Sequence, residues 1–318
     1  MPPIVAIGAS QGGVEALNTI ISGLGSDFPS PILVVLHIGA SPSILPSILS
    51  EADGMPACFA SSGDKIRPGH IFVAPPDHHL LVNDGVLELS HGPRENWARP
   101  AIDPLFRSLA LYHGPDVIGI ILSGQLNDGT AGLYEIKRQG GIAIVQTPSS
   151  AQAASMPSSA LENIAIDYCL PVAEMPRLLK RLVLETGKAK HPSRRGLTVM
   201  EQTLKTERPT ALTCPECGGA AREQSMESIT QFRCHIGHVM TAEIFASAQI
   251  DVLENTLCEI RRMLNERSSL CRSIAEKHFA KGNKQAGEYW MRAAEEAAGR
   301  MKLVEPLIDA EWTHPETA

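Results

Sequence analysis

Apolar, β-branched runs alternate with amphipathic segments over the first 186 residues of the chain. The apolar runs predict buried parallel strands near residues 3–8, 31–37, 70–74, 117–123, 141–146 and 165–169. The amphipathic segments predict helices near residues 13–24, 43–51, 102–113, 130–139 and 174–186. Such alternation is typical of a doubly wound α/β fold, in which helices cover both faces of a mostly parallel sheet.

One pair of apolar runs departs from this alternation. The segment from Leu80 to Leu89 carries Asp84-Gly85 between two short apolar runs, which is a strong signal for a tight β-hairpin. We therefore expect one antiparallel hairpin in addition to the parallel sheet. The first domain is predicted to span residues 1–187.

Residues 241–318 carry a different, helical pattern. Apolar residues recur in alternating four- and three-residue steps at Ala246, Ile250, Leu253, Leu257, Ile260 and Leu264. A second helix carries Tyr289, Trp290, Ala294, Ala297, Met301 and Leu307. With a turn at Gly282-Asn283, these predict an α-helical hairpin whose stripe is an internal core or a dimer seam. Cys258 and Cys271 are expected to be small buried apolar residues on it.

Three residues at predicted strand ends carry the candidate chemistry. Ser10 lies on the glycine-rich turn between the first strand and the first helix. His37 ends the second strand, and Asp128 follows the strand predicted at 117–123. Active sites of open α/β sheets gather at the carboxyl ends of the strands. A serine, a histidine and an aspartate in these places are typical of a nucleophilic hydrolase.

Each of the three residues also has a simpler interpretation. A glycine-rich turn before a helix binds phosphate groups, although a dinucleotide site would carry an acidic residue where the second strand here ends in His37. A single histidine is often structural, and Asp128 alone fits the N-cap of the following helix. Their joint placement at strand ends favours catalysis.

Residues 1 to about 186 resemble the catalytic domain of the bacterial chemotaxis protein-glutamate methylesterases, the CheB family. The resemblance rests on Ile7-Gly8-Ala9-Ser10-x-Gly12-Gly13, His37, Gly63-Asp64, Pro68-Gly69-His70, Ala74-Pro75-x-Asp77-x-His79, Arg99-Pro100-x-x-Asp103-x-Leu105-Phe106, Ser123-Gly124, Asn127-Asp128-Gly129-x-x-Gly132, Gln146 and Met156-Pro157, all in order. It implies that Ser10 is the nucleophile, His37 the general base and Asp128 the residue that orients His37.

The resemblance also implies the reaction. A protein-glutamate methylesterase hydrolyses γ-glutamyl methyl esters through an acyl-enzyme, and relatives deamidate glutamines through the same intermediate. Contacts to the oxyanion and substrate are expected from Gln11, Gly12, Gln125 and Arg99. Arg99 either pairs with acidic neighbours of the ester or braces its own loop with Asp103.

The chain departs from the family pattern beside the expected oxyanion site. Gln125-Leu126 stands where family members usually carry Met-Gly, and Gln11 stands where small residues or threonine are common. A backbone N–H donor survives the change at Gln125, but a glycine at position 126 serves backbone conformation. These departures keep open an alternative function, a catalytically weak adaptor of a chemosensory system that acts through its C-terminal helices.

A second cluster of chemical signals follows a basic segment with proline and glycine breakers, residues 188–210, which predicts a linker. Cys214-x-x-Cys217 is followed, sixteen intervening residues later, by Cys234-His235. Two ligand pairs at about this spacing are typical of a structural zinc site. A redox-active pair or buried thiols are the alternatives. The module at residues 211–240 is too short for an independent core, so a metal ion would stabilise it.

This second cluster resembles the zinc-ribbon-like appendage found behind some methylesterase domains, whose pattern ends Cys-x-x-Gly-His. The resemblance implies that Cys214, Cys217, Cys234 and His238 hold a structural zinc ion. His235 is the alternative to His238. No cofactor is expected for catalysis.

Composition narrows the setting of these sites. The 318-residue chain is 43% hydrophobic and has a formal net charge of -7, which argues against non-specific nucleic-acid binding. It opens directly on an apolar strand and has no long apolar span, so we expect a cytoplasmic signal-transduction protein without membrane insertion. Seven cysteines fit metal ligation better than a disulfide framework.

The resemblance implies a methylated chemoreceptor, or a related signalling protein, as substrate. Full-length family members carry an N-terminal phospho-receiver domain, whereas here the first catalytic strand begins at residue 3. We therefore expect either constitutive activity or control by a separate response-regulator partner. The C-terminal helices are expected to permit homo-oligomer formation.

Overall fold

The computed structural model describes residues 2–186, 207–226 and 229–313. The chain divides into two compact units, residues 1–245 and 246–318. The larger unit holds a seven-stranded sheet, a two-stranded hairpin and a four-stranded sheet. None of the helices in the described ranges is long and apolar enough to cross a membrane.

The seven-stranded sheet is parallel throughout, in the order β3-β4-β2-β1-β7-β8-β9. Its strands are β1 Ile4–Ala9, β2 Ile32–Leu36, β3 Ala57–Phe59, β4 Ile71–Val73, β7 Val117–Ile121, β8 Ile142–Gln146 and β9 Tyr168–Leu170. The order reverses at β1, where the chain first extends the sheet towards β2 and later towards β7. The predicted doubly wound α/β fold is confirmed.

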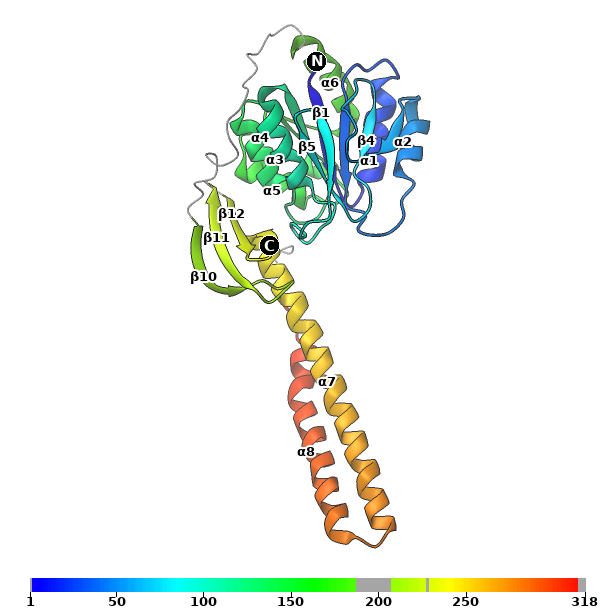
Figure 1. Cartoon of the computed structure of the whole chain (residues 1–318), viewed down its shortest axis with the longest axis vertical. Coiled ribbons are helices and arrows are strands. Elements are labelled where there is room, and N and C mark those ends of the chain that lie inside the picture. The colour runs from blue at the N-terminus through cyan, green and yellow to red at the C-terminus, as the bar shows by residue number, and fades with distance from the viewer. Residues whose placement is uncertain (1, 187–206, 227–228, 314–318) are drawn as a thin grey trace. The chain divides into compact units, whose positions relative to one another are not determined.

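Helices lie on both faces of the sheet (Figure 1), and alternate residues of the strands belong to two separate apolar layers. One layer packs against α1 Gly13–Leu24, α2 Leu45–Asp53 and α6 Met175–Thr186. The other packs against α3 Ile102–His113, α4 Thr130–Arg138 and α5 Ser155–Asn163. On β1, Val5 and Ile7 join the first layer and Ile4 and Ala6 the second, as the two-residue period of a strand requires. Short 3-10 helices cover Gly114–Asp116, Pro148–Ser150 and Val172–Glu174.

The predicted hairpin is confirmed as β5 His79–Asn83 and β6 Val86–Ser90. It forms its own two-stranded sheet rather than an edge of the large one, and its inward side chains join the second apolar layer. The edge strand β3 is absent from the sequence prediction. It has only three residues, all partly buried, and so carries little of the apolar pattern that marks a strand.

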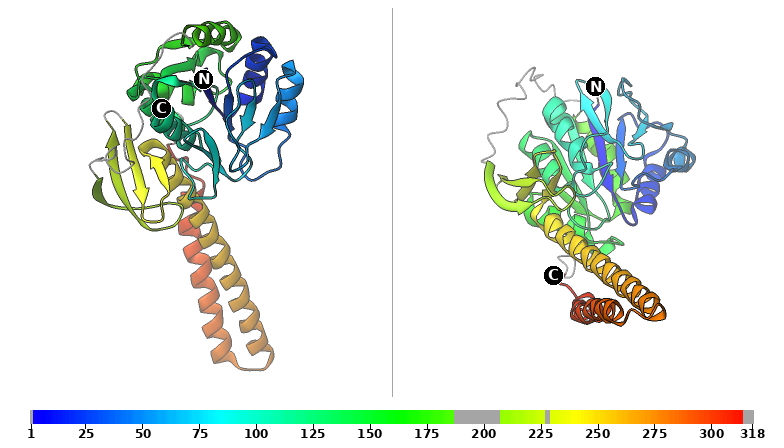
Figure 2. Two further views of the ribbon diagram at one scale, coloured as in Figure 1. Left: turned by 45° about the horizontal axis from the view of Figure 1, so that its top comes forward. Right: turned by 60° about the horizontal axis from the view of Figure 1, so that its bottom comes forward.

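A four-stranded antiparallel sheet follows, in the order β10-β11-β12-β13 (Figure 2). Its strands are β10 Glu207–Thr213, β11 Ala220–Met226, β12 Ile229–Cys234 and β13 Val239–Thr241. The predicted linker 188–210 is wrong at its end, because β10 already pairs with β11 at Glu207. The rest of that predicted linker, residues 188–206, lies outside the described residues.

The predicted helical hairpin consists of α7 Ala242–Ala280 and α8 Lys284–Ile308. The Asn283 side chain accepts a hydrogen bond from the Ala286 N–H and caps α8. The predicted internal core is wrong in part: Leu253 and Ile260 are 46% and 38% exposed. The predicted members Ala294 and Ala297 are buried, together with Cys271, Ala275 and Gly287, so the hairpin packs through small residues. Cys271 is buried as predicted, whereas Cys258 is exposed.

Candidate active site

Ser10 lies directly after β1, on the turn that leads into α1. Its N–H donates to the Ser123 carbonyl over 2.9 Å, and its own carbonyl accepts from the Gly13 N–H. Gly12 adopts φ 75, a left-handed backbone that permits this tight turn. The Ser10 side chain is thereby held at the carboxyl edge of the sheet, half-exposed.

His37 and Asp128 meet at the same edge. His37 follows β2 and Asp128 follows β7, the two strands that flank β1. The His37 Nε2 and the Asp128 Oδ2 are 2.8 Å apart, with the histidine side chain 19% and the aspartate 2% exposed. Because Nε2 faces the carboxylate, Nδ1 is the ring nitrogen that Asp128 leaves free. No hydrogen bond joins Ser10 to His37 among the residues that the structure describes.

Asp128 is fixed by several donors besides His37. The Ile102 N–H donates to Oδ2 over 2.6 Å, and the Asn96 side-chain amide donates to Oδ1 over 2.7 Å. The Asp103 N–H is 3.3 Å from Oδ1. Burial alone would raise the pKa of Asp128, but the hydrogen bond and charge of His37 and the other donors outweigh it and lower the pKa. The carboxylate therefore stays charged beside His37.

Asp103 is a second buried carboxyl close to Asp128. The Gly132 N–H donates to its Oδ1 and the Asn96 amide to its Oδ2. Burial, then the charge of Asp128, raise the pKa of Asp103 to about 7. Asn96 thus donates to both carboxyls of an acid pair whose two pKa values are driven apart.

The turn that carries Ser10 is braced by residues to which the sequence assigned no role. The Ser123 hydroxyl donates to the Gln11 carbonyl over 2.7 Å, and the Ser123 N–H donates to the Gln146 side chain over 2.9 Å. In a trans peptide the C=O and the next N–H point in opposite directions. The Gln11 carbonyl and the Gly12 N–H belong to the same peptide. Because Ser123 binds that carbonyl, the Gly12 N–H points away from Ser123. Only the family motif, which includes Ser123 and Gln146, marked these residues.

Backbone donors surround the Ser10 turn. The N–H groups of Gln11, Gly12 and Gln125 have no acceptor in the described part of the chain. The Gln125 side chain donates to the Gln11 side chain over 2.9 Å, which links the two loops. Leu126, at the position where glycine is usual, adopts φ 61. It therefore keeps a left-handed backbone that a leucine adopts at a cost.

Arg99 is occupied as a brace. Its Nε donates to the Asp77 Oδ1 over 2.8 Å, and its Nη1 donates to the Gly92 carbonyl over 2.8 Å. The arginine side chain is 14% exposed. The prediction that Arg99 braces its loop through Asp103 is wrong, because Asp103 is bound by Asn96 and Gly132. This geometry favours the bracing interpretation of Arg99 over substrate contact.

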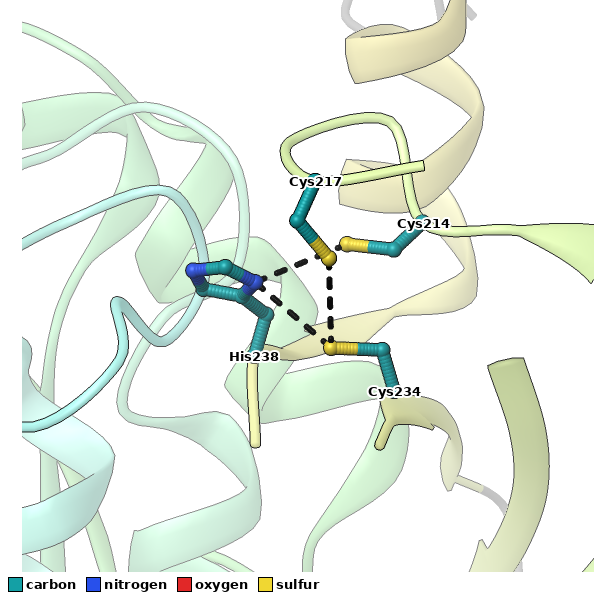
Figure 3. A group of neighbouring side chains, drawn as sticks. All are labelled: Cys214, Cys217, Cys234 and His238. Carbon is teal, nitrogen blue, oxygen red and sulfur yellow. Dashed lines mark hydrogen bonds between the residues drawn. The ribbon is translucent and has the colours of Figure 1, made fainter. Parts of the chain in front are cut away.

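A second polar cluster lies in the four-stranded sheet and its turns. Cys214, Cys217, Cys234 and His238 present ligand atoms that all lie within 4.8 Å of one another. Figure 3 shows the three thiols and the His238 Nδ1 directed at a common centre. His235 is not in the group; its ring instead packs where a side chain at Gly219 would be.

The distances in this cluster suit metal coordination better than a disulfide. The Cys217 and Cys234 sulfurs are 3.7 Å apart, and the Cys234 sulfur is 3.5 Å from the His238 Nδ1. A tetrahedral zinc site with ordinary bond lengths has edges of about 3.8 Å between sulfurs and about 3.6 Å between sulfur and nitrogen. All seven cysteines are free, so the alternative of a disulfide has no support.

Charged residues lie next to the Cys3His cluster, the name used below for Cys214, Cys217, Cys234 and His238. The His238 Nε2 lies 3.7 Å from the Glu216 Oε1, and the same oxygen lies 3.4 Å from the Arg94 guanidinium. Glu216 Oε2 is buried without a partner in the described residues. A carboxylate behind a ligating histidine fixes which ring nitrogen faces the metal. Arg94 belongs to the loop before α3, so this contact joins that loop to the turn that carries Cys214 and Cys217.

Comparisons with known proteins agree with the geometry at the strand ends. Residues 5–179 match the family model described as CheB methylesterase. An Anaeromyxobacter dehalogenans protein named protein-glutamate methylesterase/protein-glutamine glutaminase 2 is 38% identical over 180 residues, 56% of this chain and 53% of that relative. A Leptospira interrogans protein whose name carries the same two activities is 39% identical over 180 residues, 56% of this chain and 93% of its own length.

One solved structure gives the same result. The Thermotoga maritima CheB methylesterase catalytic domain is 32% identical and superimposes with a TM-score of 0.54. The match covers 57% of this chain and 99% of that domain. The matched family region ends at residue 179, so it contains the Ser10, His37 and Asp128 site and stops before the four-stranded sheet.

Proposed function

Because the chain belongs to the CheB methylesterase family, we propose that it is a serine hydrolase that cleaves γ-glutamyl methyl esters on proteins and deamidates glutamine side chains. The observation that carries this proposal is the 2.8 Å contact between His37 and Asp128 beside the turn that presents Ser10. A buried, charged carboxylate on an imidazole at this sheet edge is the arrangement needed to activate a hydroxyl.

The chemistry runs in two halves. In the first, His37 takes the proton of Ser10 as its Oγ attacks the ester carbonyl, and the same imidazole protonates the departing methanol. In the second, His37 activates a water molecule that hydrolyses the acyl-enzyme and restores the glutamate. With a glutamine substrate, ammonia leaves in place of methanol. Asp128 stabilises the imidazolium and fixes the ring orientation in both halves.

The oxyanion of each tetrahedral intermediate needs donors that are already in place. The N–H groups of Gln11, Gly12 and Gln125 are suited to this role because no group in the described part of the chain accepts from them. Ser123 supports them by holding the Gln11 carbonyl away from the site. The change from methionine to Gln125 leaves its backbone donor in place, so it is compatible with turnover.

The substrate follows from the family. We infer a methylated chemoreceptor, or a related signalling protein, acting in a cytoplasmic chemosensory pathway, with a separate response regulator as the expected source of control. Arg99 is assigned to holding the loop before α3 through Asp77 and the Gly92 carbonyl, and its contribution to substrate binding is indirect.

The Cys3His cluster is assigned to one structural zinc ion. Three thiolates and one imidazole are a common ligand set for structural zinc, and the distances between the ligand atoms match a tetrahedral site. Four protein ligands leave no open position for water, so the ion would supply folding energy rather than catalysis.

The experiment for the esterase is methanol release from a methylated receptor fragment. We expect release by the native chain and none above background by Ser10→Ala. Ser26→Ala, on an exposed loop that follows α1, is the matched control and should keep full activity. Methanol release by Ser10→Ala would contradict the assignment of the nucleophile. A native chain that binds receptor and releases no methanol would favour the adaptor function, for which the strained Leu126 is the supporting observation.

A further inference from the structure

Strand β13 of the four-stranded sheet pairs with the loop that precedes α3. The Asn96 N–H donates to the Val239 carbonyl over 2.7 Å, and the Val239 N–H is 3.4 Å from the Arg94 carbonyl. Glu95 and Val239 form a parallel bridge. Residues from outside the matched family region thus bind the backbone of the loop whose Asn96 side chain reaches Asp128.

Asn96 has every polar atom of its side chain engaged. Its Nδ2 donates to Asp128 Oδ1 over 2.7 Å and to Asp103 Oδ2 over 2.8 Å. Its Oδ1 accepts from the Thr241 N–H over 3.2 Å. The residue is 4% exposed. Because an amide has one donor end and one acceptor end, the Thr241 N–H fixes which end of Asn96 faces the carboxylates.

Thr241 also binds Asn127, the residue that precedes Asp128 in the chain. The Thr241 hydroxyl donates to the Asn127 side-chain oxygen over 2.7 Å, and the Asn127 amide donates to Glu243 over 2.9 Å. Thr241 and Asn127 are 1% and 7% exposed. The residues around β13 therefore hold Asp128 twice, once through the amide on its carboxylate and once through the residue before it in the chain.

The metal cluster lies at the other end of the same contact. His238 directly precedes β13, and Glu216 links it to Arg94, two residues before Asn96. A side chain at Gly237 would come within 3.2 Å of Pro93, so the turn between Cys234 and His238 is packed against the same loop. The turn that holds Cys234 and His238 is therefore connected to Asn96 through the contacts at Pro93 and Arg94.

We propose that β13 is a positioning element of the esterase site, in which Thr241 and Asn96 hold Asp128 in the orientation that His37 requires. Neither residue touches the substrate; both act through Asp128. The inference rests on the proposed esterase function and adds to it a source of control within this chain. A shift of β13 changes the donors on Asp128 and so changes the rate of the chemical step.

Steady-state methanol release by the full chain tests this, with kcat and KM measured separately. Thr241→Ala deletes the hydroxyl and Thr241→Ser keeps it. We expect Thr241→Ala to lower kcat about tenfold with KM unchanged, since a lost hydrogen bond in such a network costs about that factor, and Thr241→Ser to restore it. Thr230→Ala, on β12 and without a side-chain hydrogen bond to any residue that the structure describes, is the matched control and should match the native chain.

Asn96→Gly is the second variant. Asn96 adopts φ 50, which glycine tolerates, so this change deletes the side chain while it keeps the backbone that pairs with Val239. We expect a fall in kcat of about 100-fold, because donors to a charged group are worth more than neutral ones. The rate at which a fluorophosphonate labels Ser10 should fall in parallel, and this readout needs no protein substrate.

The outcomes separate the two proposals. A native chain that releases no methanol and takes no label contradicts the esterase function, and the positioning role fails with it. A native chain that is active, with Thr241→Ala and Asn96→Gly equal to it in kcat and labelling rate, overturns the positioning role alone. If Asn96→Gly does not fold, the Thr241→Ala and Thr241→Ser pair decides the question.

Discussion

The Ser10 site and the Cys3His cluster are both assembled from residues far apart in the sequence, but different forces hold them. The Ser10 site stands on β2, β1 and β7, whose residues are all buried between two apolar layers. The Cys3His cluster stands on a small sheet whose outer strand β10 has no buried residue, while its inner strand β13 is buried throughout. Packing on both sides of the sheet fixes the first cluster, whereas the second has packing on one side of its sheet and its own ligands. Ser10 stays partly exposed at the edge of its sheet. The ligand atoms of the Cys3His cluster instead face one another around a common centre.

Asp128→Asn is the largest expected break in the first cluster. The asparagine keeps the shape but loses the charge that stabilises the imidazolium, and it favours the wrong tautomer of His37. We expect kcat for methanol release to fall by roughly 10³- to 10⁴-fold. Asp84→Asn, on the exposed hairpin turn, is the matched control and should leave kcat unchanged. Retention of native kcat by Asp128→Asn would remove Asp128 from the mechanism.

Metal removal is the corresponding break in the second cluster. Elemental analysis of the protein should find one zinc ion per chain. A chelator should open residues 207–226 and 229–241 to proteolysis, because folding and metal binding are coupled in small metal-binding modules. Residues 2–186 should stay resistant. Cys234→Ser should behave like the chelated protein, and Cys258→Ser on the exposed face of α7 should not. A protein without zinc whose module resists protease would contradict the assignment.

The pH dependence of the free energy of unfolding separates the two clusters further. The buried acid pair Asp103 and Asp128 belongs to the Ser10 site and has no counterpart in the Cys3His cluster. The pKa of Asp103 is raised in the folded state to about 7. The folded chain therefore keeps this proton while the unfolded chain loses it, so Asp103 reduces stability as pH rises from about 4 to about 7, by up to about 1.4 kcal/mol per pH unit. Asp103→Asn should gain stability relative to the native chain across that window, as measured by urea unfolding. A pH-independent difference would contradict the raised pKa.

Leu126→Gly is the smallest expected effect. Leu126 adopts φ 61, which costs a leucine about 1 to 2 kcal/mol, but glycine loses more chain entropy on folding. We expect the free energy of unfolding to rise by less than about 1 kcal/mol, with kcat unchanged. A large rise in kcat would instead show that the departure at Leu126 restrains turnover.

The parts that the sequence predicted share one property: local patterns encode them. The strand ends that carry Ser10, His37 and Asp128 follow unbroken apolar runs, and the Asp84-Gly85 turn marks its hairpin. The spacing of the cysteines indicated a metal site, and the family resemblance supplied His238 rather than His235 as the fourth ligand, which is the set that the structure brings together. Each of these signals lies within a few residues, so it can be interpreted without knowledge of the fold.

The parts that the sequence did not predict depend on distant partners. The Asn96 side chain meets Thr241 across 145 residues, and no local pattern distinguishes this asparagine from a turn residue. The helical hairpin shows the same effect in another form. Its periodic apolar stripe predicts a core, and the structure buries Ala294 and Ala297 of that prediction but leaves Leu253 exposed. Periodicity gives the spacing of a face but not which face packs.

The 145-residue separation between Asn96 and Thr241 also has a consequence for synthesis. A ribosome adds about 5–20 residues per second, so the last strand of the seven-stranded sheet, β9, is made about 4 to 14 seconds before Thr241. A nascent chain can then carry Ser10, His37 and Asp128 on a folded sheet while Asn96 still lacks its last partner. The nascent chain would reach full activity only after Thr241 has been made and β13 has paired with the loop that carries Asn96.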